Sequence, residues 1–450
     1  MKKGLWMIII IGLGLAILAY SQESYKDLDV FSEVFLNVKQ SYVDHSKTGS
    51  KELIYGAING MLQTLQDPFT RFMTPQAHKE METELSGQFG GLGIVITIKD
   101  NKLVVISPIE DTPAYKIGVK ADDWITHIDG TSTEGITLQD AVSKMRGQPG
   151  TNVTITITRR KEPNPIIYTI TRDIIKIKSV KAEILDDNVG YIRVSSFNNN
   201  TISEFNDVFN EISKANPEYI ILDLRNNGGG TLQASVGVSG KFLAGGSLVV
   251  YTKGRENTPE IRYVAENSGA KVKAKMIVLI NGGTASGAEI LAGALKDHKK
   301  GILFGKKTFG KASVQTVYNL SDGSGLALTT AHYYTPAGNL IHGKGIEPNI
   351  VVEEEQISEE KRKIIEKFED GTFTEEFVEN YATCTDKEIE QFIASLKKSG
   401  IELEKKYILR DIEKEKKDLK GEKPSLIDMF CDTQLARAIE IIKAREFWKE

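Results

Sequence analysis

The chain has 450 residues, which is more than one hydrophobic core usually serves, so we expect several domains. Hydrophobic residues make up 40% of the chain and charged residues 26%, an ordinary balance for a globular protein. The formal net charge of -4 gives no reason to expect a nucleic-acid partner.

The N-terminus has the pattern of a targeting segment. Two lysines precede an uncharged stretch from Gly4 to Tyr20, and a small-residue cleavage site precedes Gln22. The stretch is a little short for the roughly 20 residues that span a bilayer, so the sequence leaves two alternatives open for residues 1–21, a cleaved signal peptide or an uncleaved membrane anchor. Both predict export to the periplasm or to the extracytoplasmic face of the cell membrane.

Residues 22–85 have the spacing of amphipathic helices. Apolar residues recur three and four positions apart at Phe31, Val34, Phe35 and Val38, and again at Leu53, Ile54, Ala57, Ile58, Met61, Leu62 and Leu65. The pattern predicts an N-terminal helical region. A helical cover for the protein core is one use of such a region, and dimerisation is the other.

Residues 86–172 form a separate, mostly β module in the sequence pattern. Glycines from Gly90 to Gly93 precede an alternating strand that begins at Ile94. A second strand at 103–108, a helical stretch at 137–145 and a strand at 152–158 follow.

This order of elements resembles a PDZ domain of the bacterial, circularly permuted kind. In such domains a peptide adds as a strand to the sheet edge, and loop N–H groups bind its terminal carboxylate. The resemblance assigns that role to the N–H groups of Gly90, Gly91, Leu92, Gly93 and Ile94. The structural alternative is a small sheet domain that only supports its neighbour.

Residues 173–352 contain three sequence blocks that are candidates for a functional site. The first is an apolar strand followed by a glycine turn. The run from Tyr219 to Asp223 is typical of a strand buried in an α/β sheet, and a polar turn from Leu224 to Gly230 separates it from a helical pattern. Consecutive N–H groups in such a turn can bind an anion. Taken alone, the block is also a plain strand-to-helix turn.

The second block places a serine at the start of a helix. The β-branched run from Lys275 to Ile280 predicts a buried strand, and Ser286 then opens a stretch with helical spacing. Unpaired N–H groups at a helix N-terminus favour negative charge, which suits a nucleophile. Serine is also a preferred helix cap, so Ser286 alone would not identify a site.

The third block is a glycine-rich stretch around Lys311. The spacing from Gly305 to Lys311 almost fits a phosphate-binding loop, but Ala312 stands where a magnesium-binding hydroxyl is needed, and a strand pattern follows where a helix is needed. We therefore exclude nucleotide binding. A lysine held in a poorly hydrated pocket has a lowered pKa and can take a proton from a serine hydroxyl, while Gln315 could hydrogen-bond its amine.

Together the three blocks resemble the C-terminal processing peptidases, tail-specific proteases of the S41 family that carry a PDZ domain. The resemblance runs from about Tyr25 to Val352. It implies that Ser286 is the nucleophile, Lys311 the general base and Gln315 the orienting residue. It also implies that the oxyanion hole is formed by the N–H groups of Gly229, Gly230 and Gly287.

The resemblance implies an α/β multidomain fold, with a crotonase/ClpP-like α/β serine-protease core, an inserted PDZ domain and helical N- and C-terminal regions. It further implies an exported serine endopeptidase that binds apolar C-terminal tails of protein substrates and cleaves them through an acyl-enzyme. In this family an N-terminal helical region often mediates homodimerisation. Two residues depart from the family pattern, Gly228 where proline is common and Gly287 where alanine is usual.

Other mechanisms have weaker support in the sequence. A Ser-His-Asp triad would need one of six histidines; His298 lies too far along the helix from Ser286, whereas His332 and His342 stay open. No histidine or cysteine spacing indicates zinc, and we expect no cofactor. A catalytically silent PDZ scaffold is the alternative function, and the joint presence of Ser286, Lys311 and Gln315 argues against it.

Beyond Val352 the chain is rich in lysine and glutamate and carries no catalytic motif. We expect amphipathic helices at 357–369, 374–381, 386–399 and 425–444, with a solvated, charge-dense helix at 402–420. Cys384 and Cys431 both lie in this extension, and the sequence leaves a disulfide and two free thiols equally open.

Overall fold

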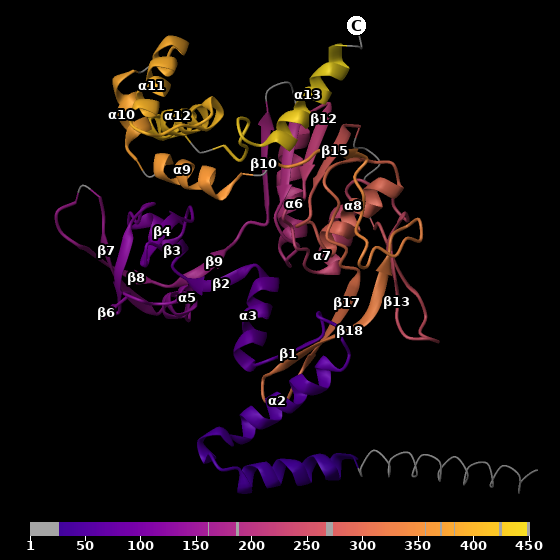
Figure 1. The fold of residues 1–450 in the computed structure, drawn as a ribbon. Helices are drawn as coiled ribbons and strands as arrows, with labels where there is room; N and C mark the ends of the chain where they lie inside the picture. Colours follow the sequence, from indigo (N-terminus) through magenta and orange to yellow (C-terminus); the bar gives the residue numbers. More distant parts are fainter. Residues whose placement is uncertain are drawn as a thin grey trace, which may run out of the picture. The chain divides into compact units, whose positions relative to one another are not determined.

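We describe the protein from a computed structural model, which covers residues 27–447 except 161, 186–188, 267–272, 356, 370, 382 and 423–424 (Figure 1). The predicted targeting segment at 1–21 lies outside these described residues. The chain divides into two compact units, one of residues 1–78 with 315–329 and one of residues 79–314 with 330–450. Among the described residues, no helix has the length and apolar character needed to cross a membrane.

The first unit confirms the predicted N-terminal helices. Residues 27–41 are helical, and α2 (Ser50–Gln63) follows a single 3-10 turn, η1 (His45–Lys47). Strand β1 (Arg71–Met73) pairs antiparallel with the first residues of β18 (Gly325–Tyr334). This strand was not predicted, because three residues are too few to display an alternating pattern.

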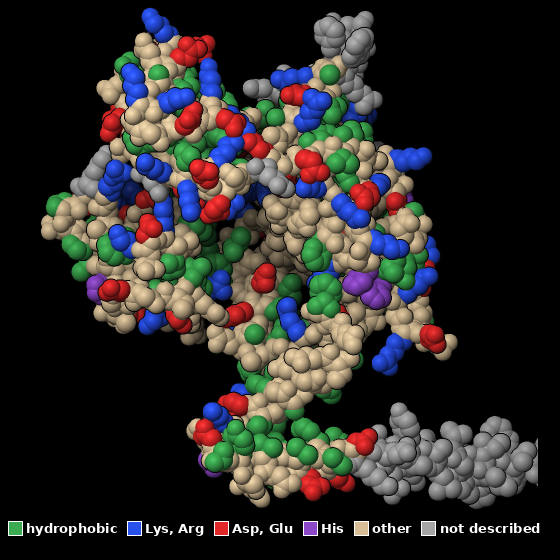
Figure 2. Space-filling view, viewed as in Figure 1, with side chains coloured by type: hydrophobic (Ala, Val, Ile, Leu, Met, Phe, Trp, Pro, Cys, Tyr) green, Lys and Arg blue, Asp and Glu red, His purple; other side chains and the backbone are tan. Residues whose placement is uncertain are grey.

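Helix 27–41 exposes several apolar side chains to solvent. Several of its large hydrophobic side chains are 46–60% exposed: Leu28, Val30, Phe31, Val34 and Leu36 (Figure 2). The predicted amphipathic pattern is therefore present, but in the described structure these residues do not serve as a buried cover.

In the second unit, the PDZ-like module has its own antiparallel sheet and core. Its strands follow the order β3 (Ile94–Lys99), β4 (Lys102–Pro108), β5 (Trp124–Ile128), β7 (Asn152–Thr158) and β8 (Ile166–Thr171), with β6 (Thr131–Ser132) on β5. Helix α5 (Leu138–Met145) and the short α4 (Pro113–Lys116) complete it. Thr137 caps α5 by accepting from the Asp140 N–H. The predicted strands and helix of this module are confirmed.

The module that carries Ser286 and Lys311 is built on a six-stranded sheet. Its order is β10 (Val180–Leu185), β11 (Val189–Val194), β12 (Tyr219–Asp223), β15 (Lys275–Ile280), β16 (Ile302–Gly305) and β19 (Ile350–Val351), parallel from β11 onward. The predicted bounds of β12 and β15 are confirmed, because strands buried on both faces read as continuous apolar runs.

Alternate residues of these strands face two different helical layers. Ile220, Leu222 and Val278 share a core with α6 (Thr201–Lys214), α7 (Leu232–Ser239) and α8 (Gly287–Asp297). Ile221 and Leu279 face the opposite side and pack with α13 (Thr433–Phe447). This module is therefore a three-layer α/β sandwich, and its last layer comes from the C-terminal region.

The remaining strands belong to two further sheets. Helix α3 (Pro75–Ser86) leads to β2 (Gln88–Gly91), which pairs with β9 (Asp173–Lys176). Strand β13 (Leu248–Lys253) pairs with β14 (Ile261–Val264) and with the last residues of β18, and β17 (Ser313–Asn319) also pairs with β18.

The C-terminal extension folds into helices with a core of their own. These are α9 (Glu359–Glu369), α10 (Phe373–Asn380), α11 (Asp386–Lys398) and α12 (Lys405–Lys420), packed around Phe368, Phe377 and Phe392. The last helix begins at Thr433 and not at 425, because Asp428 accepts the N–H groups of Phe430 and Cys431 and folds a turn there. Cys384 and Cys431 are free thiols.

Candidate active site

Ser286 sits in a strained turn between β15 and α8. Its backbone has φ 53° and ψ -119°, a combination that costs an L-residue free energy of order 1–3 kcal/mol. The surrounding structure must therefore impose it. A sharp, strained strand-to-helix turn is also the geometry that raises a nucleophilic serine above the end of a sheet.

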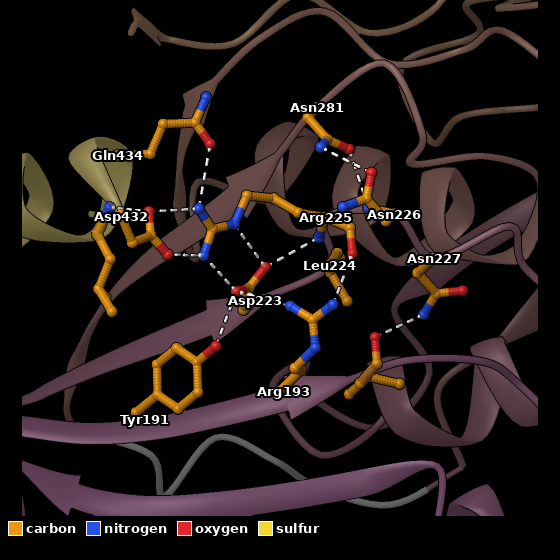
Figure 3. A network of polar contacts seen from close by, with 12 residues as sticks. Tyr191, Arg193, Asp223, Leu224, Arg225, Asn226, Asn227, Asn281, Asp432 and Gln434 are labelled. Atoms are coloured by element: carbon orange, nitrogen blue, oxygen red, sulfur yellow. Dashed lines mark hydrogen bonds and ion pairs between the residues drawn. The ribbon is translucent and has the colours of Figure 1, made fainter. Parts of the chain in front are cut away.

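The glycine turn after β12 lies directly against this serine turn. The Thr284 hydroxyl donates to the Leu224 carbonyl at 2.9 Å, and the Ala285 N–H donates to the Asn227 carbonyl at 2.9 Å. Asn226 and Asn281 bind each other through side chain and backbone, as Figure 3 shows. Because β12 and β15 are neighbouring parallel strands, both turns lie at the same sheet edge, where α/β proteins bind ligands.

The predicted oxyanion glycines come together in this contact. A Cβ on Gly229 would lie 2.7 Å from both the Gly287 nitrogen and the Ser286 Cβ, so only glycine fits there. The Gly229 N–H itself donates to the Asn227 side chain at 2.8 Å. For the N–H groups of Gly230 and Gly287, the described part of the chain provides no acceptor.

The structure accounts for one of the two departures from the family pattern. A Cβ at Gly228 would meet nothing within 4 Å, so the surroundings leave room for a side chain and give no steric reason for glycine. A Cβ at Gly287 would lie 2.4 Å from the Ser235 hydroxyl oxygen, so the usual alanine does not fit beside this serine.

Buried Glu289 joins the serine turn to the lysine loop. Its Oε2 accepts the N–H groups of Ser286 at 2.9 Å and Lys311 at 2.8 Å, and its Oε1 accepts the Gly310 N–H at 2.8 Å and the Thr308 hydroxyl at 2.5 Å. Burial raises the pKa of Glu289, although these four hydrogen bonds oppose the shift. Sequence analysis missed this residue, but Ser286-x-x-Glu289 fits the capping-box pattern that could have found it.

Tyr333 holds the same two residues through their carbonyl groups. Its hydroxyl lies 3.0 Å from the Ser286 oxygen and 2.5 Å from the Lys311 oxygen, so one donor is shared between two acceptors. Burial, with a smaller contribution from the charge of Glu289, raises the pKa of Tyr333 well above its ordinary value. The phenol therefore stays protonated and available as a donor.

A strand follows the Lys311 loop, as the sequence predicts. No helix follows it; β17 begins at Ser313, which agrees with the exclusion of a phosphate loop. The Phe309 N–H donates to the Thr284 carbonyl at 3.0 Å and ties the loop to the serine turn, while the Lys311 side chain is half-buried. Gln315 lies on β17 in the first unit, where its amide donates to the Thr329 hydroxyl at 3.1 Å.

The two histidines left open by the sequence, His332 and His342, and the more distant His298 have other contacts. His332 precedes Tyr333 on β18, so it faces the side of the strand opposite to the contact with Ser286. His342 accepts the Ala312 N–H through Nδ1 at 3.4 Å, and His298 Nε2 lies 2.7 Å from the Leu248 carbonyl. Within the described ranges, no three histidine, cysteine or acidic side chains converge on a point that could hold a metal ion.

A buried ion-pair network lies where β12 ends and the glycine turn begins (Figure 3). Asp223 is fully buried and binds Arg225 at 2.6 Å, Arg193 at 3.0 Å and the Tyr191 hydroxyl at 2.8 Å. Burial raises the pKa of Asp223, but the two arginines outweigh it and hold the pKa below its ordinary value. Asp223 is therefore a fixed anion at the end of β12.

The predicted carboxylate-binding residues of the PDZ module fall into two groups. Gly90 and Gly91 belong to β2 and pair with β9, whereas Leu92 and Gly93 form the connection to β3, which begins at Ile94. Gly93 has φ +80°, and its Cβ would clash with Thr112 at 2.2 Å. Strand β3 lies at an edge of the sheet formed by the described strands, which leaves room for an added strand.

Comparisons with known proteins match this arrangement. Residues 188–352 match the model of peptidase family S41, residues 104–159 that of a PDZ domain, and residues 18–77 that of the activating protease CtpB N-terminal domain.

Relatives of the chain cover most of its length. It is 43% identical over 337 residues to the carboxy-terminal-processing protease of Bartonella bacilliformis, covering 74% of this chain and 76% of that protein. It is 35% identical over 325 residues to the carboxy-terminal processing protease CtpA of Bacillus subtilis, covering 72% and 69%. A solved structure, the photosystem II D1 C-terminal processing protease, is 32% identical with a TM-score of 0.43, covering 72% of this chain and 92% of that one.

Proposed function

The chain belongs to the S41 family of C-terminal processing proteases with a PDZ domain, and from this premise we propose that it is a serine endopeptidase with a Ser286-Lys311 dyad. The observation that carries the proposal is the strained backbone of Ser286, fixed to the Lys311 backbone through one carboxylate oxygen of Glu289. Strain of this kind persists at functional sites because the surroundings impose it.

In the proposed mechanism, Ser286 Oγ attacks the carbonyl carbon of the scissile peptide bond while the neutral Lys311 amine takes the hydroxyl proton. The tetrahedral intermediate collapses to an acyl-enzyme, and the lysine ammonium gives its proton to the leaving amine. Water then attacks the ester with Lys311 as the base, which releases the acid and restores the serine. Gln315 stays a prediction from the sequence, as the residue that orients the amine.

The negative oxygen of the intermediate needs donors that are already in place. The N–H groups of Gly230 and Gly287 are our candidates, since the Gly229 N–H already has the Asn227 side chain as acceptor. Gly229 instead permits the close approach of the two turns. An oxyanion donor of this kind is worth roughly 3 kcal/mol of barrier.

We further propose that the PDZ module binds the apolar C-terminal tail of a protein substrate as a strand beside β3. The tail carboxylate would bind the N–H groups at the Leu92–Ile94 end of the segment from Gly90 to Ile94. Half-buried Ile94 and Ile96, which pack against the core of the module, support an apolar preference.

Export and dimerisation complete the proposal. Residues 1–21 would direct export as a signal peptide or an anchor. A second copy of the chain is our proposed partner for the exposed apolar row on helix 27–41. Cell fractionation tests the first claim, and light scattering of wild type and Phe31→Glu tests the second.

The function is tested with a peptide substrate that ends in an apolar tail. Ser286→Ala and Lys311→Ala should each abolish cleavage, whereas Lys307→Ala should not, since Lys307 lies in the same loop but pairs with Glu347 at 2.9 Å on the surface. Amidation of the substrate tail should slow cleavage by wild type. Undiminished cleavage by Ser286→Ala would reject the dyad, and equal cleavage of the amidated tail would reject carboxylate binding.

A further inference from the structure

Helix α13 completes the catalytic sheet from outside the matched S41 region. Four of its side chains, Leu435, Ala438, Ile439 and Ile442, are at most 6% exposed and share one cluster with strands β10, β11, β12, β15 and β16. The S41 match ends at residue 352. A segment more than 70 residues further along the chain therefore belongs to the catalytic core.

Two side chains at the start of this helix bind Arg225, in the turn that leads to the oxyanion glycines (Figure 3). Asp432 accepts from Nη1 at 2.7 Å and Nη2 at 2.6 Å, and Gln434 lies 3.4 Å from Nη1. On the other edge, Nε and Nη2 bind Asp223 at 3.0 and 2.6 Å. These contacts match all five donor N–H groups of a guanidinium.

The network is largely buried, so the loss of one charged partner would cost free energy of folding. The Arg225 side chain is 12% exposed and that of Asp432 20%, while Asp223 is fully buried. Burial lowers the pKa of Arg225, but the hydrogen bonds that it donates to Asp432 and Asp223 outweigh burial and raise the pKa above its ordinary value. Removing one carboxylate would leave a charged donor edge buried and without its acceptor.

Contacts continue from Arg225 to the proposed oxyanion donor. The next residue, Asn226, donates its N–H to Asn281 in the serine turn at 2.9 Å, and Asn227 accepts the Gly229 N–H at 2.8 Å. Gly230 follows directly. Arg225 is thus the second residue of the turn from Leu224 to Gly230, and three of its five side-chain hydrogen bonds go to acceptors in the C-terminal segment.

We propose that Asp432 is a positioning residue, which fixes the turn from Leu224 to Gly230 by holding Arg225 from the C-terminal side. Its effect on catalysis rests on the proposed function, whereas its effect on the turn does not. The C-terminal segment is then required for a competent active site and is not an appendage to a finished protease.

The variant Asp432→Asn tests this inference in the full-length chain. It keeps the side-chain size and the oxygen that accepts the Leu435 N–H at 2.9 Å, but removes the charge and one acceptor of Arg225. The matched control is Glu440→Gln on the same helix, which removes a carboxylate that pairs with Arg437 where both side chains are 62% exposed.

We expect Asp432→Asn to lower kcat about tenfold or more with KM within about twofold, since misplaced reacting groups affect the chemical step. Asp432→Glu should recover part of the rate, and Glu440→Gln should equal wild type. A kcat for Asp432→Asn within about twofold of wild type would overturn the inference.

Amide hydrogen exchange gives a readout that needs no activity. The amides of residues 224–229 should exchange faster in Asp432→Asn than in wild type or Glu440→Gln, while those of β15 keep their protection. Unchanged exchange in the turn, or a uniform loss across the sheet, would each overturn a positioning role. Faster turn exchange in a chain that lacks Ser286-dependent cleavage would contradict the proposed function and still support the inference.

Discussion

The backbone N–H groups of Ser286 and Lys311 bind the same oxygen, Oε2 of Glu289, at 2.9 and 2.8 Å. The carbonyl groups of the same two residues share the Tyr333 hydroxyl. The proposed nucleophile and base are therefore fixed relative to each other through their main chains. Glu289 and Tyr333 act through them and are positioning residues.

Replacing Glu289 with glutamine should lower kcat about tenfold or more with KM little changed, because one of two acceptor oxygens becomes a donor that faces two other donors. The measurement is steady-state cleavage of a tailed peptide. Glu347→Gln is the control, since Glu347 pairs with Lys307 on the surface. Wild-type kcat in a folded Glu289→Gln chain would show that the shared oxygen is dispensable.

Removing the Tyr333 hydroxyl should cost about 1–3 kcal/mol of unfolding free energy, because the Lys311 carbonyl loses this donor and the Ser286 carbonyl keeps only the N–H groups of Glu289 and Ile290. Denaturant unfolding of Tyr333→Phe measures this loss. Tyr334→Phe is the matched control on the same strand, since Tyr334 stacks on Tyr251 through its ring. Equal unfolding free energies for the two variants would contradict the role of the Tyr333 hydroxyl.

Gly287→Ala should lower kcat/KM about tenfold, because the new methyl group clashes with the Ser235 hydroxyl and shifts a proposed oxyanion donor. Adding Ser235→Ala removes the clash and should restore most of the rate. A double-mutant cycle with the Ser235→Ala single variant measures the coupling. If the double variant is no better than Gly287→Ala alone, the steric explanation is wrong.

The Asp223 network should make the free energy of unfolding depend on pH in the acidic range. The folded-state pKa of Asp223 lies below its ordinary value of 3.8, so its stabilisation is present above that pH and is lost as the pH falls through the lower, folded-state pKa. Asp223→Asn should therefore cost about 3–5 kcal/mol at pH 7. The difference from wild type should shrink below pH 3.8, which denaturant unfolding at both pH values measures.

Local patterns predicted much of this fold, and particular residues explain why. Strands β12 and β15 are buried on both faces, so Tyr219–Asp223 and Lys275–Ile280 stand out as continuous apolar runs. The amphipathic C-terminal helices were also predicted, apart from the start of α13, where Asp428 folds an extra turn.

Contacts between distant residues could not be predicted in this way. Arg225 and Asp432 lie 207 positions apart, and neither belongs to a local sequence pattern that indicates the other as its partner. Tyr333 reaches the site only because β18 runs past it. The strand pattern around Tyr333 does not indicate that its hydroxyl contacts the Ser286 and Lys311 carbonyl groups. Glu289 differs, since its spacing from Ser286 is a capping-box pattern that was overlooked.

The most direct test of the Ser286-Lys311 dyad is covalent labelling with a fluorophosphonate ester, followed by mass spectrometry of the modified peptide. The proposed mechanism predicts one adduct, on Ser286, that forms at the wild-type rate in Lys307→Ala and far more slowly in Lys311→Ala. An adduct on another residue in the active protein, or equal labelling rates in Lys311→Ala and Lys307→Ala, would contradict it.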